Sequence, residues 1–460
     1  MVAKEPEFDP RYRRPKPSRA IRRLVIWYRR NAAVTSLVGT ATSSATTMAS
    51  AAGSVAGSVA GSVASTAGSV LYPLRRLQQG AGGLEAPIRE ADRLWVAVDG
   101  MGGDFAPGPI LAGCLDAVRV LPLRVRFVAE EAALQEAVAA LDLGEELREA
   151  VAAGLLELIS SGPSVEMHEE ARVVRRKRDA SINLAMDQVS QGQAMAVYSA
   201  GNSGAVMAAA IFRLGRLKGI DRPAIGALFP TKDPAEQVLV LDVGANMDCK
   251  PAYLHQFGLL GSIYSRDVLG VANPRIGLLN IGEESCKGND LTVKAYPLLE
   301  AESRLRFAGN CEGRDVLSGQ FDVVVCDGYT GNVLLKFLES VGGVLLDVLR
   351  AELPRGRRGK VGSAFLRSNL VRIKKRLDHA EHGGALLLGV NGICVIGHGS
   401  SKALSVVSAL RLAHRAASHG VMDDLHQLSA ASTAEAGREE AGAEPGPEAG
   451  AKAGAIPACG

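Results

Sequence analysis

A chain of 460 residues is long enough for two to three domains of ordinary size, or for one large α/β unit with terminal extensions. Hydrophobic residues make up 47% and charged residues 22% of the sequence, which excludes a wholly disordered or collagen-like chain. A formal net charge of +3 is too small to indicate a nucleic-acid-binding protein. Seven cysteines without a C-x-x-C pair indicate a reducing compartment, so we expect a cytoplasmic protein with no disulfide framework and no metal site.

Both ends of the chain differ in composition from its middle. Residues 31–74 carry no charge, and Ala-Gly-Ser-Val occurs four times between Ala52 and Val70. Small and hydroxyl-bearing residues dominate there, so insertion as a membrane-spanning helix is poorly driven. We expect a low-complexity N-terminal extension over residues 1–90. Residues 421–460 end in a stretch rich in Ala, Glu, Gly and Pro without apolar periodicity, which predicts a disordered C-terminal tail.

The region between these ends, residues 91–420, alternates short β-branched runs with helix-like segments. This alternation predicts a three-layer α/β/α domain whose mainly parallel sheet is covered by helices on both faces. The expected strands are residues 95–98, 125–128, 155–159, 195–198, 238–241, 276–281, 305–307, 323–326 and 393–396.

Six loops that follow these strands share glycine with Asn, Ser or Asp. Because ligands of open parallel sheets bind outside the carboxyl ends of the strands, these loops are the expected site. Glycine allows close backbone approach, and the following helix N-termini supply oriented N–H groups that favour anions. None of the loops has the pattern of a nucleotide P-loop or of a dinucleotide fingerprint. The candidate phosphate- and substrate-binding residues are Asp99, Gly102, Gly103, Asp104, Asn202, Ser203, Asn246, Asn289, Asp327, Thr330, His398 and Ser400.

Five segments resemble, in order, the signatures of the bacterial phosphate acyltransferase (PlsX) family. They are residues 98–107, 199–204, 219–223, 287–289 and 327–332. The resemblance implies a homodimer with an isocitrate-dehydrogenase-like fold that needs no cofactor. It implies transfer of a long-chain fatty acyl group from acyl carrier protein to orthophosphate. The acyl-phosphate product would then serve a membrane glycerol-3-phosphate acyltransferase in phosphatidic acid synthesis.

Attack of phosphate on a thioester needs a cation to bring the phosphate close and a donor for the developing oxyanion. Lys287 and Asn332 match positions regarded as catalytic in the resembling family, and both lie in loops that follow strands. The alternatives are that Lys287 is a surface cation and Asn332 a helix N-cap. His398 could act as a general base or could hold a turn. A covalent role for Cys286 is a minor alternative, because the family motif does not require cysteine there.

Two basic segments suggest surfaces that bind a partner protein or a membrane. Four consecutive cations, Arg175, Arg176, Lys177 and Arg178, could attract the acidic acyl carrier protein, although a run of charges is more often simply solvated.

The second basic segment, residues 353–382, contains nine basic residues and one acidic residue between Leu353 and His379. Its apolar residues Leu366, Leu370, Ile373 and Leu377, with Phe365 beside them, follow helical spacing. We therefore expect an amphipathic helix on an anionic membrane surface, with packing on the body or on a partner subunit as the alternative. The protein would then be peripherally attached to the inner face of the cell membrane.

Two other functions remain open from the sequence. One is an NAD-dependent dehydrogenase of the isocitrate or isopropylmalate type, although no dinucleotide site or carboxylate cluster for a divalent ion is found. The other is a non-catalytic regulator that binds acyl carrier protein.

Overall fold

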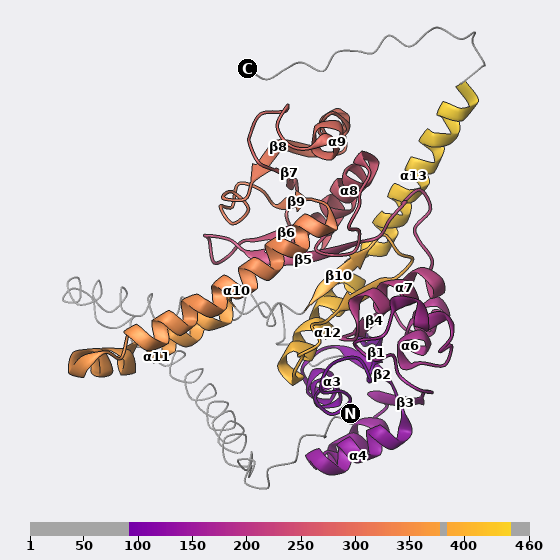
Figure 1. Cartoon of the computed structure of the whole chain (residues 1–460). Coiled ribbons are helices and arrows are strands. Elements are labelled where there is room, and N and C mark those ends of the chain that lie inside the picture. Colours follow the sequence, from indigo (N-terminus) through magenta and orange to yellow (C-terminus); the bar gives the residue numbers. More distant parts are fainter. Residues whose placement is uncertain (1–91, 378–383, 443–460) are drawn as a thin grey trace, which may run out of the picture. The chain divides into compact units, whose positions relative to one another are not determined.

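The computed structural model describes residues 92–377 and 384–442, which belong to one compact unit. The predicted N-terminal extension, residues 1–90, lies outside the described residues. Within the described ranges, the strands form one sheet in the order β3-β2-β1-β4-β11-β10-β5-β6-β9-β7-β8 (Figure 1).

The sheet consists of two parallel groups. The first contains β1 (Leu94–Asp99), β2 (Leu123–Ala129), β3 (Leu156–Ser160), β4 (Ala196–Ser199) and β11 (Ile393–Ile396). The second contains β6 (Gln237–Leu241), β7 (Arg275–Asn280), β8 (Arg306–Glu312) and β9 (Val323–Val325). Between them lie β5 (Ala224–Pro230) and β10 (Ala385–Leu388), each antiparallel to both of its neighbours. Three antiparallel pairings in succession reverse the direction, so the two groups run opposite ways.

This reversal brings the carboxyl ends of both groups together. Ile396, the last residue of β11, pairs with Ala385 of β10. The next residue of β10, Leu386, pairs with Gly226 of β5, which in turn pairs with Leu241, the last residue of β6. The loops that leave β11 and β6 therefore meet near the same part of β5, although the strands point in opposite directions.

The predicted fold class is confirmed, and all nine expected strands are present. The two strands that the sequence analysis missed are β5 and β10. The strands within each group are parallel, as predicted. The two strands that were not predicted, β5 and β10, form the antiparallel centre of the sheet.

Helices cover both faces of the sheet. They are α3 (Gly108–Val120), α4 (Glu131–Leu141), α5 (Gly144–Ala152), α6 (Ser181–Ser190), α7 (Ser203–Arg213), α8 (Pro251–Asp267), α9 (Asp290–Ala301), α10 (Gly328–Glu352), α11 (Gly356–Leu377), α12 (Ala403–Ser418) and α13 (Val421–Gly442), with a 3₁₀ turn, η2, at Ala171–Arg175. One core contains buried side chains of α3, α8, α12 and α13, and the other those of α6 and α7. Neighbouring residues of one strand divide between the cores: Val96 and Val98 join the first, and Ala97 the second. Alternation along the strands thus produces the expected three layers.

The prediction of a disordered tail from residue 421 is wrong for its first part. Residues Val421–Gly442 form α13, and Val421, Leu425 and Leu428 are buried against the first core. These residues follow helical spacing, a signal that the Ala- and Glu-rich remainder of the segment obscured. Residues 443–460 lie outside the described part of the chain.

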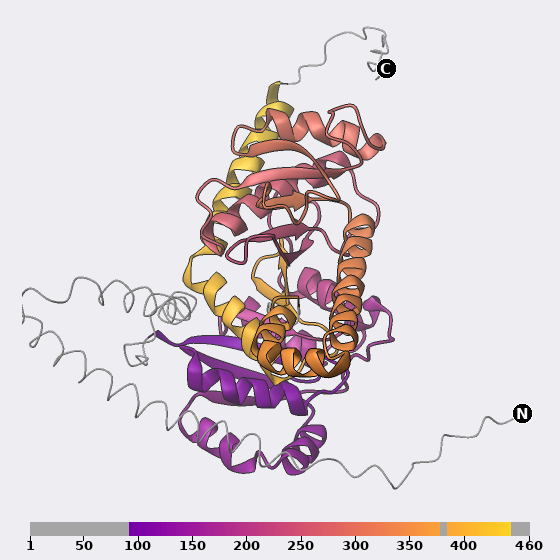
Figure 2. The ribbon, with the colours of Figure 1, turned by 90° about the vertical axis from the view of Figure 1, so that its left-hand side faces the viewer.

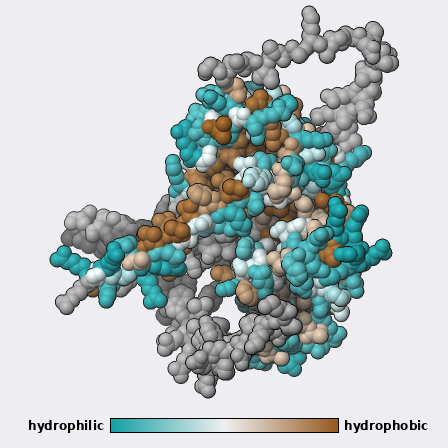
Figure 3. All heavy atoms as spheres, in the orientation of Figure 1, coloured by the Kyte–Doolittle hydropathy of each residue, from teal (hydrophilic) through white to brown (hydrophobic). Residues whose placement is uncertain are grey.

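The helices α10 and α11 follow each other along the chain and lie at the surface (orange in Figure 1 and Figure 2). Of the 25 residues of α10, only Gly328 and Gly331 are buried. A hydrophobic strip follows α10 on the face drawn in Figure 3. Its exposed apolar side chains are Val333, Phe337, Val341, Val344, Leu345 and Val348. We call this set the α10 stripe. In the described ranges, no helix combines the length and apolar content that a bilayer crossing requires.

Candidate active site

A cavity of about 470 Å³ lies where the two groups of strand ends meet. Its volume is in the range of about 300–1,000 Å³ that is usual for small-molecule sites. Its polar lining comes from several loops and helices: Asp104, Tyr198, Ser203, Asn332, Lys336, Glu339, His398, Ser401 and Ser405. The site therefore draws on residues that are more than 200 positions apart in the sequence.

Three helices begin at or near this cavity. Ser203 is the first residue of α7, Ser405 is the third of α12, and Asn332 is the fifth of α10, and all three line the cavity. The first turn of a helix has free N–H groups and the positive end of the helix dipole. Ser203 and Ser405 lie in the first turns of their helices, and these two helix ends favour a bound anion of about the size of phosphate.

The rest of the cavity wall is apolar. It is formed by Met167, Ile225, Ala227, Leu228, Val243, Leu335, Ala385, Ile396 and Ala409. Several of these residues belong to β5, β10 and β11, where the antiparallel centre of the sheet supplies a smooth surface. A ligand with both an anionic group and a hydrocarbon portion fits this combination of linings.

Asp99 is buried beneath the loop that follows β1. Only 3% of the residue is exposed, and its carboxylate accepts hydrogen bonds of 2.6 Å from the hydroxyls of Ser181 and Ser199. Burial raises the pKa of Asp99, while these hydroxyls and the backbone N–H groups of Met101 and Gly102 oppose the rise. Asp99 was a candidate for binding substrate directly. We now propose that it positions the β1 and β4 loops instead.

Glycine is needed where these two loops touch. A Cβ atom on Gly102 would lie 2.7 Å from both an Asp99 oxygen and the backbone nitrogen of Gly201. Gly103 has a φ of +121°, which side chains rarely adopt. Beyond them, the backbone N–H of Asp104 donates to the carbonyl of Gly399 at 2.8 Å, which ties the β1 loop to the β11 loop. Glycines 102 and 103 thus permit the contacts that place Asp104 at the cavity.

Asp242 has the corresponding place at the end of β6. It is fully buried, and its carboxylate accepts from the backbone N–H groups of Ala245 at 2.7 Å and Asn246 at 2.8 Å. The Asn246 side chain donates to the same carboxylate and to the carbonyl of Pro223. Asn246, a substrate-binding candidate, is therefore occupied in holding this loop. The loop supports α10, because the Gly328 N–H donates to the Asn246 carbonyl at 2.7 Å.

Three other candidates cap helices, and a fourth, Thr330, donates to one of these caps. Asn202 accepts from the Ala205 N–H at the start of α7, and Asn289 accepts from the Thr292 N–H at the start of α9. At α10 the Asp327 carboxylate accepts from both the N–H and the hydroxyl of Thr330. The cap of α10 is therefore Asp327, and Asn332 lies inside the helix rather than at its N-cap.

His398 lines the cavity and also holds a turn. The backbone N–H of Ser400 donates to His398 Nδ1 at 3.2 Å, and the Ser400 hydroxyl lies 2.8 Å from the same nitrogen. The turn role that the sequence left open is thus present, and the ring remains at the cavity wall.

Lys287 and Asn332 are not brought together in this cavity. Lys287 follows β7, and its backbone is held by Glu284 and by the side chain of Asn280. It is absent from the residues that line the cavity, whereas Asn332 is present. The lysine of the lining is Lys336, which sequence reasoning missed. Its position four residues after Asn332 on one helix was the signal that could have found it.

The fold and the cavity define an α/β protein with a partly polar, partly apolar cavity between two sets of strand ends. Residues 94–424 match the family model described as "Fatty acid synthesis protein". The chain is 77% identical over 431 residues to a phosphate acyltransferase of Prochlorococcus marinus (strain MIT 9313), covering 92% of this chain and 96% of the relative. It is 75% identical over 426 residues to a phosphate acyltransferase of Parasynechococcus marenigrum (strain WH8102), covering 93% and 97%. This chain belongs to the phosphate acyltransferase family.

Similarity to solved structures is more distant. A phosphotransacetylase from Streptococcus pyogenes is 12% identical, with a TM-score of 0.49 that covers 71% of this chain and 94% of the other. The resemblance seen in the sequence is confirmed by the family match, and the protein is an acyltransferase that acts in fatty acid and phospholipid synthesis. Family membership favours acyl transfer over the dehydrogenase and the non-catalytic alternatives.

Proposed function

We propose that this acyltransferase moves a long-chain fatty acyl group from acyl carrier protein to orthophosphate and forms acyl-phosphate. The observation that carries the proposal is the cavity whose lining combines the first turns of α7 and α12 with an apolar wall. The helix starts suit the phosphate, and the apolar wall suits the acyl chain.

Phosphate can attack the thioester directly, so the protein mainly has to position the two reactants. A phosphate oxygen forms a bond to the thioester carbonyl carbon, the carbon–sulfur bond breaks, and the carrier thiolate leaves with the electron pair and is then protonated. Asn332 would donate a hydrogen bond to the oxyanion that develops on the carbonyl oxygen. The family resemblance assigns Lys287 a catalytic role as well, and we retain it as a proposal from the loop after β7.

Acyl carrier protein is the proposed donor partner. Arg175, Arg176 and Arg178 are exposed, as docking to an acidic partner requires. Lys177 is held by the Glu169 carboxylate at 2.7 Å and by the Ser164 carbonyl, so we expect the smallest contribution from it. Charge reversal of the three arginines should lower kcat/KM for the carrier protein and weaken its dependence on salt.

The product would be passed to a membrane glycerol-3-phosphate acyltransferase for phosphatidic acid synthesis, and the cytoplasmic face of the membrane is the proposed place of action. The helix α11 supports this proposal, because Phe365 is 82% exposed and Leu366 and Ile373 are also exposed. Leu370 is half-buried, and the side chain of Leu377 lies outside the described residues. Residues 378–382, the end of the predicted membrane element, also lie outside them.

We also propose that the protein forms a homodimer. The α10 stripe supports it, because Phe337 is 66% and Val344 is 61% exposed in the single chain. Contiguous apolar surface of this kind is typical of a subunit interface.

The proposed function is tested by incubating the full chain with acyl carrier protein carrying a palmitoyl thioester and with inorganic phosphate. Hydroxylamine added at intervals converts acyl-phosphate to a hydroxamate that is measured directly. Phosphate-dependent release of free carrier thiol, equal to the hydroxamate formed, is the expected result. Thiol release without phosphate dependence, or no hydroxamate, would contradict the assignment.

A further inference from the structure

Lys336 lies in the cavity with Asn332. The two residues are four positions apart on α10, so they share one face and are separated by about 6 Å along the helix axis. Both line the cavity, and among the described residues that do so Lys336 is the one lysine or arginine. A multiply charged anion that enters the cavity would therefore meet this ammonium group.

The same cavity contains two carboxylates, and one of them pairs with Lys336 when no substrate is bound. Asp104 and Glu339 both line it, and the Glu339 carboxylate lies 3.0 Å from Lys336 Nζ. The side chain of Lys336 is 55% exposed, and that of Glu339 is 19% exposed. Because the lysine of this ion pair is more than half exposed, water screens the attraction, and an oxyanion with two charges can displace the carboxylate. A well-buried pair would resist such an exchange.

We propose that Lys336 binds the attacking orthophosphate in this cavity, by exchanging its contact with Glu339 for a phosphate oxygen. The inference rests on the proposed function and adds a residue to it. The ammonium group reduces the repulsion between the phosphate and the oxyanion that develops as the new carbon–oxygen bond forms. Asn332, one turn earlier on α10, contacts the carbonyl side of the same reaction.

Steady-state kinetics of the full chain test the proposal. Lys336→Gln should raise KM for phosphate at least tenfold and change KM for the acyl carrier thioester less than twofold, because only the phosphate contact is lost. Lys336→Arg should recover part of the phosphate affinity. A matched control is Lys294→Gln, which removes an exposed lysine paired with Asp290 at 2.7 Å on α9. A phosphate KM for Lys336→Gln within twofold of the parent would overturn the assignment.

Glu339→Gln tests the exchange itself. It leaves Lys336 in place and removes the competing carboxylate, so KM for phosphate should fall several-fold. A KM that stays the same or rises would contradict the exchange.

A binding measurement separates this inference from the proposed function. Thermal unfolding is followed with inorganic phosphate, or with chloride at the same ionic strength, and without carrier protein. The parent and Lys294→Gln should gain several degrees in Tm with phosphate, and Lys336→Gln should gain much less at the same phosphate concentration. If these Tm changes are seen in a protein that forms no acyl-phosphate, the phosphate site at Lys336 is supported and the proposed reaction is rejected. Equal gains in Tm for parent and Lys336→Gln, in a protein that does form acyl-phosphate, would reject the role of Lys336 and keep the reaction.

Discussion

At the scale of single residues, Asn332 lines the cavity and is the proposed donor to the oxyanion. We expect Asn332→Ala to lower kcat about 10²- to 10³-fold, the usual loss for one oxyanion donor, with little change in KM for phosphate. Lys287→Ala should also lose activity, because Lys287 has a proposed catalytic role. The hydroxamate assay measures both, with circular dichroism to confirm that the variants are folded. Near-parental kcat in a folded Asn332→Ala protein would remove Asn332 from the mechanism.

Asp242 shows how a buried residue can support the site without touching substrate. Its carboxylate accepts hydrogen bonds from Ala245 and Asn246, and the β6 loop so formed supports the start of α10. Asp242→Asn places an NH₂ group among these donors, so the free energy of unfolding should fall by about 1–3 kcal/mol for each hydrogen bond to charge that is lost. Urea unfolding measures the change. Asp248→Asn, an exposed carboxylate nearby, is the control and should change stability little.

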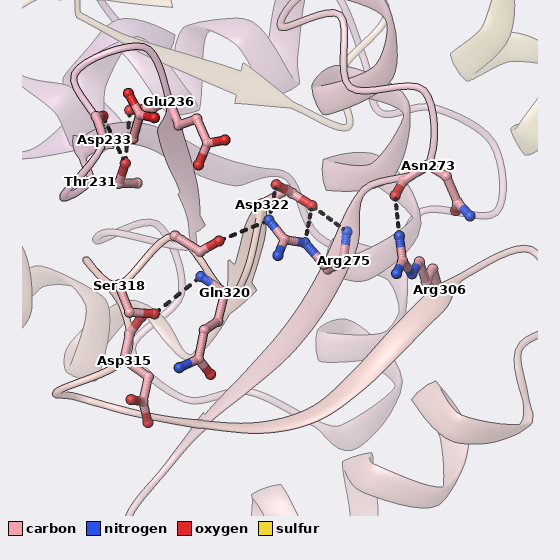
Figure 4. Close-up of polar contacts among 11 residues, drawn as sticks. Thr231, Asp233, Glu236, Asn273, Arg275, Arg306, Asp315, Ser318, Gln320 and Asp322 are labelled. Atoms are coloured by element: carbon pink, nitrogen blue, oxygen red, sulfur yellow. Dashed lines mark hydrogen bonds and ion pairs between the residues drawn. The ribbon is translucent and has the colours of Figure 1, made fainter.

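At the scale of elements, one ion pair joins the beginnings of β7 and β9. Arg275 donates from Nε and Nη2 to the two oxygens of Asp322 at 2.9 and 2.8 Å, and its backbone N–H donates to the same carboxylate at 2.7 Å (Figure 4). Burial opposes ionisation of Asp322, but these bonds from Arg275 outweigh it and hold the pKa below its ordinary value of 3.8. The pair therefore stabilises the second strand group while Asp322 is ionised.

Arg275→Met should lower the free energy of unfolding by about 1–3 kcal/mol at neutral pH. Because the folded pKa of Asp322 is lowered, the stabilisation is present above pH 3.8 and is lost as pH falls through the folded pKa. The difference between parent and variant should therefore shrink in that acidic range, as urea unfolding at several pH values can show. Arg314→Met removes an arginine whose side chain is 70% exposed and should change stability by less than about 1 kcal/mol. A pH-independent difference for Arg275→Met would contradict the role of the pair.

The α10 stripe is the element on which a second subunit is expected to pack. Phe337→Asp places a charge in the middle of the stripe and should convert a dimer to a monomer, as light scattering after gel filtration can measure. Phe337→Leu keeps the apolar character and should remain dimeric. A parent protein that is monomeric at micromolar concentration would rule out the stripe as a stable dimer interface.

At the scale of the whole molecule, α11 is expected to hold the enzyme reversibly on an anionic membrane. Replacing Leu370 and Ile373 with Asp should release the protein from anionic liposomes and leave activity on acyl carrier protein unchanged. The control is Ser368→Asp with Asn369→Asp, which adds the same charge at polar, exposed positions of α11. Residues 22–30 contain four arginines with Trp27 and Tyr28, a composition that can also bind lipid, so the comparison is repeated in a chain that begins near Ala91. Equal sedimentation of all variants with liposomes, or no preference of the parent for anionic lipid, would contradict membrane binding by α11. The alternative that α11 packs against protein would then be favoured.

The sequence by itself determined the fold class, the family and nine of the strands, because these depend on local patterns. Runs such as Val238 to Leu241 are strongly β-forming, and glycine-rich loops such as that from Asp99 to Asp104 are recognisable wherever they lie. Helical spacing of Leu366, Leu370 and Ile373 likewise predicted the helix that forms α11.

Tertiary structure alone decided which loops share the site. β5 and β10 reverse the sheet, and this reversal makes the ends of β11 and β6 meet. No local pattern signals such a meeting, because it depends on pairing between residues that are far apart in the chain. The same holds for chemistry: Asp99 and Asp242 resemble ligand-binding carboxylates in sequence, but burial commits them to hydrogen bonds within their own loops. In sequence, only its spacing of four residues from Asn332 points to Lys336, and the cavity to which α10 brings it is what gives that lysine its proposed role.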